Sequence, residues 1–305
     1  MLIDLARASQ NNSYNKYNLY YQSLFNHFSF DLKYDFMLNY NCYLGQMSQL
    51  EFTWEVFMIP KIIHYIWLGG NPLPKIAEKC IESWKKMCPD YEIKRWDESN
   101  LDLEKYEFCK DALASRKFAF ASDVLRTDIL YNHGGLYLDI DVEIIKPIDE
   151  LLEKHDCFMG FETSNLLNPG LIIGTVPKNK DLENILKIYK KTKFDANNLI
   201  KLTVCEIFTD YFKTKGLVAN NTTQTIETTT FYNSEYFSPI DVITSKKKVT
   251  SNTKSIHWYN ASWYSPKQNF RKICKKILNV CTFGLFGKWL NKRRNKAKVE
   301  IKNEK

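Results

Sequence analysis

Two aspartates, Asp139 and Asp141, interrupt the apolar stretch HGGLYLDIDVE at residues 133–143. The apolar residues and the preceding glycines predict a buried strand that follows a turn. Because strand side chains alternate between faces, both carboxylates would point the same way. Two negative charges about 4 Å apart repel by roughly 4 kcal/mol at an effective dielectric constant near 20. A divalent cation would relieve this repulsion, since Mg²⁺ and Mn²⁺ prefer oxygen ligands and keep coordination positions for phosphates.

A lone Asp-X-Asp would more often be a solvated strand end whose carboxylates bind loop amides. Here a second pair of charged residues precedes it, because Asp123 and Arg126 lie three residues apart on a predicted helix and share one face. Together they could hold a polyhydroxylated ligand, with the carboxylate accepting from hydroxyls and the guanidinium donating to them. A surface ion pair is the alternative interpretation of this spacing.

Two further segments carry candidate ligand groups. Trp67 follows a predicted strand and precedes two glycines, where an aromatic ring could stack on a nucleobase. The segment SIHWYNASW contains His257, which could complete a metal site or contact a phosphate, followed by Ser262 and Trp263. A core tryptophan and a core histidine are the alternatives. Glu162 and Asn168 are weaker candidates for groups that face a sugar or an acceptor.

The surrounding pattern predicts an α/β fold in which helices cover both faces of a sheet. Apolar stretches and helical periodicity predict strands at 61–67, 91–96, 133–143, 156–162 and 170–175, and helices at 71–88, 117–134, 148–155, 179–192 and 199–215. The segments 222–233 and 254–260 are rich in β-forming residues.

The 305 residues divide into three zones. Residues 1–57 are rich in Asn, Tyr and Phe with poor periodicity, and are either a helical extension or a segment upstream of a true start at Met58. Residues 58–263 carry the αβ alternation. Residues 264–305 form a basic tail with 13 Lys and Arg against 2 Asp and Glu. Since the whole chain has a net charge of +8, the rest of it is mildly acidic.

Other features limit the protein class. The chain has no run of 18 apolar residues that would predict a transmembrane helix, and its start lacks a signal-peptide pattern. The eight cysteines form no C-X-X-C pair, so a structural zinc site is disfavoured and a reduced, cytoplasmic setting is expected.

The basic tail combines apolar residues at helical spacing with Lys and Arg between them, which is typical of an interfacial helix. We expect residues 268–298 to contact an anionic membrane surface on its cytoplasmic side. A solvated basic helix, or a helix packed on the body of the protein, are alternatives. Nucleic acid is not an expected partner, because the phosphate backbone requires charge and not this many apolar residues.

The segments IPKIIHYIWLGGNPLP, ASDVLRTDILYNHGGLYLDIDVE and HWYNASW, taken together and in this order, resemble the DXD-containing sugar transferases of glycosyltransferase family 32. That family includes capsular-polysaccharide enzymes and initiating mannosyltransferases, and is distantly similar to the glucosyltransferase domains of large clostridial toxins. The resemblance covers residues 58–263. It implies a GT-A fold, a nucleotide-sugar donor, Mn²⁺ or Mg²⁺, and a retaining reaction.

The resemblance also implies roles for individual residues. Trp67 would stack on the base, Asp123 and Arg126 would hold the donor sugar, and Asp139 would contact the ribose and sugar. Asp141 would bind the metal, with Asp139 and His257 as further ligands, and His257, Ser262 and Trp263 would close over the diphosphate. Asp139, Asp141 and Arg126 are the candidate catalytic residues.

We therefore expect a glycosyltransferase that builds a surface glycan on a glycan or lipid-linked acceptor. A toxin-like effector that glycosylates a protein, and a non-catalytic protein that binds glycan or membrane, are the alternatives.

Overall fold

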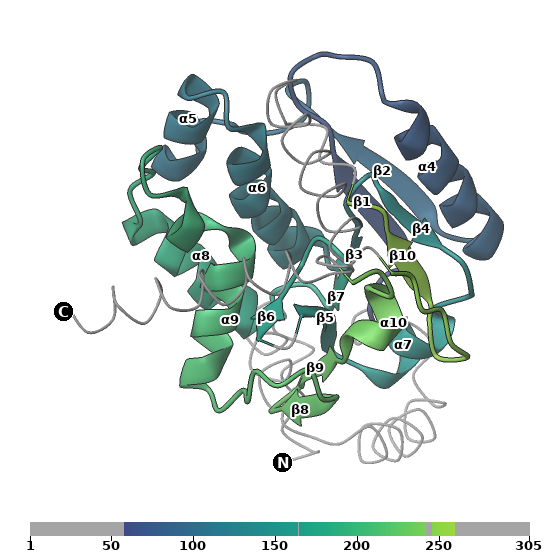
Figure 1. The fold of residues 1–305 in the computed structure, drawn as a ribbon. Coiled ribbons are helices and arrows are strands. Elements are labelled where there is room, and N and C mark those ends of the chain that lie inside the picture. The colour runs from purple at the N-terminus through teal and green to yellow at the C-terminus, as the bar shows by residue number, and fades with distance from the viewer. Residues whose placement is uncertain (1–57, 164, 242–245, 260–305) are drawn as a thin grey trace, which may run out of the picture.

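A mixed β-sheet with helices on both faces forms the centre of the computed structural model, which describes residues 58–163, 165–241 and 246–259 (Figure 1). The large sheet has the strand order β2-β1-β3-β7-β5-β9-β8, with β6 paired to β5, and β4 and β10 form a separate two-stranded sheet. The predicted zones 1–57 and 264–305 lie outside the described residues, so the proposed division into three zones stays a prediction.

The strands of the described residues are β1 (Ile62–Ile66), β2 (Glu92–Trp96), β3 (Gly135–Tyr137), β4 (Val142–Ile144), β5 (Cys157–Thr163), β6 (Leu166–Leu167), β7 (Ile173–Thr175), β8 (Gln224–Ile226), β9 (Thr229–Tyr232) and β10 (Ser255–His257). The helices are α4 (Lys75–Met87), α5 (Glu107–Ala114), α6 (Phe118–His133), α7 (Asp149–Lys154), α8 (Lys180–Lys191), the 3₁₀ helix η2 (Leu199–Leu202), α9 (Val204–Thr214) and α10 (Ser234–Phe237). None of these helices is long and apolar enough to span a bilayer.

Two apolar cores cover the two faces of the large sheet. Alternate side chains of β5 show the division, because Met159 and Phe161 pack with α5, α6, α8 and α9, whereas Phe158 packs with α7 and α10. Helix α4 lies on the Phe158 side, and Figure 1 shows it separated by the sheet from α5, α6, α8 and α9. This arrangement confirms the predicted α/β class and is the sheet architecture expected of a GT-A fold.

Helix α6 leads directly into the central strand β3. The helix ends at Gly134, which has a φ of 65° and whose amide donates to the carbonyl of Leu130. A Cβ at Gly134 would lie 2.8 Å from the backbone nitrogen of Pro177, so both the conformation and the space require glycine. The short connection holds Asp123 and Arg126 of α6 close to the carboxyl end of β3.

A buried histidine ties this connection to β1 and β2. His64 Nδ1 accepts a hydrogen bond from Trp96 Nε1 at 3.0 Å, so Nε2 carries the proton and donates to the carbonyl of Gly134 at 3.0 Å. His64 is fully buried, and burial lowers its pKa to about 4. His64 is therefore a neutral core residue at neutral pH.

Most predicted elements are present, with two differences. The helix predicted at 199–215 is interrupted at Thr203, which adopts an extended conformation and caps α9 by accepting from the amide of Glu206. The strand predicted over 133–143 is divided into β3 and β4 by a turn. Helices α5 and α10 were not predicted, because both are short and lie in segments without clear periodicity.

Candidate active site

Asp139 and Asp141 lie in a tight turn between β3 and β4, and the prediction that they share a strand face is wrong. β3 ends at Tyr137, and the amide of Val142 donates to the carbonyl of Asp139 at 3.0 Å. The chain turns here because β4 leaves the large sheet and pairs with β10. The turn, and not strand alternation, brings the two carboxylates together.

Strand β10 places His257 beside this turn. His257 pairs with Val142 in the antiparallel ladder, and its Nε2 lies 3.0 Å from Oδ1 of Asp141. One ligand atom from each of Asp139, Asp141 and His257 lies within 4.8 Å of the others. Burial lowers the pKa of His257, but the carboxylates of Asp141 and Asp139 outweigh this effect and raise the pKa above its usual value. A protonated imidazole would balance part of the negative charge of the turn.

The side chains of Asp139, Asp141 and His257 fit a divalent cation. Two carboxylates and one imidazole offer the oxygen and nitrogen ligands that suit Mn²⁺, and the carboxylates also suit Mg²⁺. Nδ1 of His257 is buried and has no hydrogen-bond partner among the described residues, so Asp141 orients the ring. A bound cation would balance the carboxylates in place of the imidazole proton.

Arg126 connects two carboxylates at the edge of this cluster. Its Nη2 lies 2.9 Å from Oδ1 of Asp123 on the same helix, and its Nη1 lies 3.2 Å from Oδ1 of Asp139. The guanidinium also stacks over the ring of Tyr137 at 4.5 Å. Asp123 and Arg126 are both buried, so their pairing is not the surface salt bridge that their spacing alone would suggest. We name Asp123, Arg126 and Asp139 the carboxylate–arginine clamp.

The charges of the clamp depend on one another. Burial raises the pKa of Asp123 to about 7, and this rise is limited by Arg126 and by a hydrogen bond from the amide of Val204. Burial also raises the pKa of Asp139, again opposed by Arg126. Burial lowers the pKa of Arg126, but the charge of Asp139 outweighs it, so the guanidinium stays protonated. Arg126 is therefore the cation that limits the rise in pKa of both carboxyl groups.

A cleft joins the clamp, the aspartate turn and the end of β1. Its lining includes Trp67, Phe118, Ser122, Arg126, Asp139 and Asp141. Trp67 is half-buried at the end of β1, and its Nε1 donates to the carbonyl of Asn71 at 2.6 Å. An aromatic ring, a guanidinium and two carboxylates thus line one space.

Gly170 and Val204 also contact the site, and sequence reasoning had not selected either of them. The carbonyl of Gly170 accepts from the amide of Asp139 at 3.0 Å, and the amide of Val204 donates to Oδ2 of Asp123 at 3.3 Å. The Asn-Pro-Gly sequence does signal a turn at Gly170. No local signal marks Val204, because it acts through its backbone 81 residues away from Asp123.

The weaker candidates occupy different environments. Asn168 is buried, and its Oδ1 accepts from the amide of Gly170 at 2.7 Å, so it stabilises the turn beside Asp139. Glu162 lies at the end of β5, and its charge adds to those that raise the pKa of His257. Ser262 and Trp263 lie outside the described residues.

Residues 74–158 match the family described as "Glycosyltransferase sugar-binding region containing DXD motif". This range includes the whole carboxylate–arginine clamp and both aspartates of the turn. Arg126, Asp139 and Asp141 line one cleft, and Asp123 contacts Arg126 behind it. The chain carries the sugar-binding region of a DXD-containing glycosyltransferase. The family and the enzyme class predicted from the sequence motifs are thereby confirmed.

This glycosyltransferase is 27% identical over 227 residues to an uncharacterized glycosyltransferase of Acanthamoeba polyphaga mimivirus, a match that covers 72% of the chain and 87% of the relative. It is 32% identical over 125 residues to inositol phosphoceramide mannosyltransferase 3 of Schizosaccharomyces pombe, which covers 40% of the chain and 32% of that protein. The chain therefore spans about a third of the length of the yeast relative.

Among solved structures, a glycosyltransferase involved in the glycosylation of the major capsid of PBCV-1 is 16% identical. The match has a TM-score of 0.41 and covers 71% of the chain and 99% of that protein.

Proposed function

We propose that this glycosyltransferase moves a sugar from a nucleotide-sugar donor to a glycan or lipid-linked acceptor in surface polysaccharide synthesis, with retention of configuration and with Mn²⁺ or Mg²⁺. The observation that carries the proposal is the common cleft that joins the aspartate turn, the carboxylate–arginine clamp and Trp67. A purely structural cluster would not need an aromatic ring, a guanidinium and two carboxylates to line one open space.

The assignment of the donor follows the chemistry of these groups. Trp67 would stack on the nucleobase, a contact worth about 1–3 kcal/mol in stacking platforms. Asp141, with Asp139 and His257, would hold the cation against the diphosphate. Asp123 and Arg126 would grip the hydroxyls of the sugar, because a carboxylate accepts from hydroxyls and a guanidinium donates to them.

The chemistry requires a stabilised leaving group. Breaking the bond between the anomeric carbon and the phosphate oxygen places negative charge on the nucleoside diphosphate, and a divalent cation supplies Lewis-acid stabilisation of that charge. The acceptor hydroxyl forms the new bond to the anomeric carbon on the face that the phosphate leaves. Its proton passes to the departing phosphate oxygen. Arg126, permanently charged, sits beside Asp139 and limits the repulsion between that carboxylate and the diphosphate.

The yeast relative supports a mannosyl donor and a lipid acceptor, because its name describes mannosyl transfer to inositol phosphoceramide. A lipid-linked acceptor would also explain the composition of the tail, in which basic and apolar residues alternate over 268–298. We extend the proposal to peripheral attachment at the cytoplasmic face of a membrane.

The test is donor hydrolysis and transfer by the purified full chain. GDP-mannose, UDP-glucose, UDP-galactose and UDP-N-acetylglucosamine are each incubated with Mn²⁺, with Mg²⁺ or with a chelator, and nucleoside diphosphate release is measured. We expect release from one donor that depends on the cation. Absence of both binding and hydrolysis for every donor and cation would refute the proposal.

A further inference from the structure

We propose that helix α9 is the scaffold that positions both carboxylates of the clamp, through the amide of Val204 at its start and the hydroxyl of Thr209 in its middle. The proposal rests on the proposed function, in which Asp123 and Arg126 grip the donor sugar. It adds a positioning role for two groups that do not themselves line the donor cleft.

The start of α9 is directed at Asp123. The first amides of a helix have no acceptor within the helix, and the N-terminal end carries a partial positive charge. The amide of Glu206 is satisfied by the capping hydroxyl of Thr203 at 3.3 Å. The amide of Val204 instead donates to Oδ2 of Asp123 at 3.3 Å, while Arg126 holds Oδ1 at 2.9 Å. Each oxygen of Asp123 is therefore held by a different partner, Oδ1 by Arg126 and Oδ2 by the amide of Val204.

The middle of α9 supports the other carboxylate through the backbone of the β6 segment. Thr209 is fully buried, and its hydroxyl donates to the carbonyl of Cys205 at 2.6 Å and accepts from the amide of Leu167 at 2.9 Å. Three residues after Leu167, the carbonyl of Gly170 accepts from the amide of Asp139. A shift of α9 along its axis would thus move the supports of Asp123 and Asp139 together.

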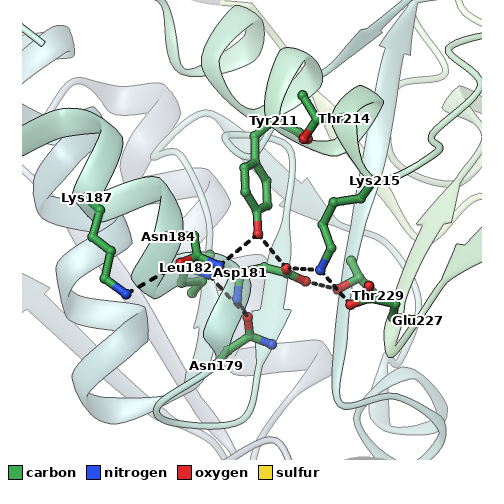
Figure 2. Close-up of polar contacts among 10 residues, drawn as sticks. All are labelled: Asn179, Asp181, Leu182, Asn184, Lys187, Tyr211, Thr214, Lys215, Glu227 and Thr229. Carbon is green, nitrogen blue, oxygen red and sulfur yellow. Dashed lines mark hydrogen bonds and ion pairs between the residues drawn. The ribbon is translucent and has the colours of Figure 1, made fainter. Parts of the chain in front are cut away.

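The C-terminal end of α9 is fixed by a buried carboxylate. Figure 2 shows Asp181 of α8 at the centre of this contact. Tyr211 donates to its Oδ1 at 2.8 Å, Lys215 lies 2.7 Å from the same oxygen, and Thr229 of β9 donates to Oδ2 at 3.1 Å. Since a helix rises by about 1.5 Å per residue, this anchor lies roughly 10 Å from Val204. It sets where the start of the helix meets Asp123.

The alternative is that α9 only packs in the core. Phe208 and Phe212 of α9 are buried, so the helix would be needed for stability in either case. The two interpretations differ in what happens when a single polar contact is removed without loss of the apolar face. A positioning role predicts a loss specific to the sugar, because the nucleotide part of the donor contacts other residues.

The experiment compares Val204→Pro with Val204→Ala. Proline is tolerated at the first position of a helix, and the extended conformation of Thr203, with φ −67° and ψ 144°, suits a residue before proline. Val204→Pro removes the donor to Asp123 and places a ring carbon where the hydrogen was. Val204→Ala keeps the amide and removes only side-chain packing, so it is the matched control.

Calorimetry measures the affinity of each variant for GDP-mannose and GDP, and for UDP-glucose and UDP. For the pair that the wild type binds, we expect Val204→Pro to weaken nucleotide-sugar binding at least tenfold while nucleoside diphosphate binding changes less than twofold. Val204→Ala should leave both affinities within twofold of the wild type, although its Tm falls. Equal losses for sugar-bearing and sugar-free nucleotides in Val204→Pro, or no loss, would overturn the proposal.

A second pair of variants keeps the test decisive if Val204→Pro fails to fold. Thr209→Val removes the acceptor for the Leu167 amide at nearly constant volume, whereas Thr209→Ser retains it. We expect Thr209→Val to lose affinity for the nucleotide sugar but not for the nucleoside diphosphate. We expect Thr209→Ser to keep the wild-type affinity for both. Identical nucleotide-sugar affinities for the two variants would contradict the role of Thr209.

A stability measurement separates this inference from the proposed function. If the amide of Val204 supports Asp123, the Tm losses of Val204→Pro and Asp123→Asn should not add in the double variant, whatever ligand the protein binds. Additive Tm losses would reject the contact itself. Non-additive losses in a protein that binds none of the nucleotides would reject the proposed function and keep the positioning role.

Discussion

The backbone of Gly170 lies against the carboxylate of Asp139. The carbonyl of Gly170 accepts from the amide of Asp139 at 3.0 Å, and a Cβ at Gly170 would overlap Oδ2 of Asp139 and lie 2.9 Å from its Cγ. The Asn168 side chain fixes this approach by accepting from the amide of Gly170 at 2.7 Å. The orientation of the Asp139 carboxylate therefore depends on the absence of a side chain at position 170.

Gly170→Ala should therefore displace the carboxylate of Asp139 and lower transfer activity at least tenfold, about 1.4 kcal/mol in transition-state stabilisation. The φ of Gly170 is not positive, so alanine brings no backbone strain there. Initial rates at saturating Mn²⁺ and donor test this. Wild-type rates in a folded Gly170→Ala protein would show that the position of Asp139 is not critical.

Asp141→Asn should abolish transfer and leave the fold intact. The substitution removes the charge that would bind the cation, and it also removes a buried negative charge beside Asp139. Rates at increasing Mn²⁺ and circular dichroism are measured alongside the control Asp195→Asn, which changes an exposed aspartate. If Asp141→Asn matches the wild type at saturating Mn²⁺, the metal assignment fails.

Trp67→Ala should weaken binding of the donor and of the free nucleoside diphosphate equally, by about 1–3 kcal/mol, because both carry the base. Trp67→Phe keeps an aromatic face and should recover most of the affinity. Calorimetric titration provides the comparison. An unchanged nucleotide affinity combined with a lower Tm would make Trp67 a packing residue.

His64 should make stability depend on pH between about 4 and 6.5. Its pKa in the folded protein is lowered to about 4 by burial, so the unfolded chain binds more protons in this window and stability falls as the pH falls. The expected loss from this residue between pH 7 and pH 5 is about 2 kcal/mol. Urea unfolding at both pH values, for the wild type and for His64→Asn, measures it.

His64→Asn keeps one donor and one acceptor for the carbonyl of Gly134 and the indole of Trp96 but does not titrate in this range. Other groups contribute equally to both proteins, so the difference between them isolates His64. A wild type and a variant with the same pH dependence would show that His64 is not held neutral by the fold.

The basic tail should bind the full chain to vesicles that contain anionic lipid. Each Lys or Arg near such a surface contributes about 1 kcal/mol, and salt screens the attraction. In co-sedimentation, the full chain should bind anionic vesicles, bind neutral vesicles poorly and be partly released by high salt. A variant that ends at Ser265 should stay in the supernatant and still hydrolyse the donor. Identical partitioning of the two proteins would exclude a membrane role for the tail.

The types of side chain in the site could be predicted from residues that lie only a few positions apart in the sequence. The i,i+3 pair of Asp123 and Arg126 depends only on helical geometry, and the strand ending at Tyr137 depends on apolar residues within a few positions. The sheet class follows in the same way, since alternating strand and helix patterns require layers that cover both faces. Local spacing was insufficient at Asp139 and Asp141, because an apolar run does not reveal that its second half pairs elsewhere.

Contacts between residues far apart in the sequence determined how the side chains of the site are oriented. His257 reaches Asp141 across 116 residues because β10 pairs with β4, and Val204 reaches Asp123 across 81 residues because α9 begins at Val204. Neither contact has a local signature, since each depends on which distant backbone satisfies a free donor or a strand edge as the core forms. The tertiary structure likewise determined that Gly170 borders Asp139. The types of residue in the site could therefore be predicted from the sequence, whereas the orientation of their side chains depends on how the sheet and the helices pack.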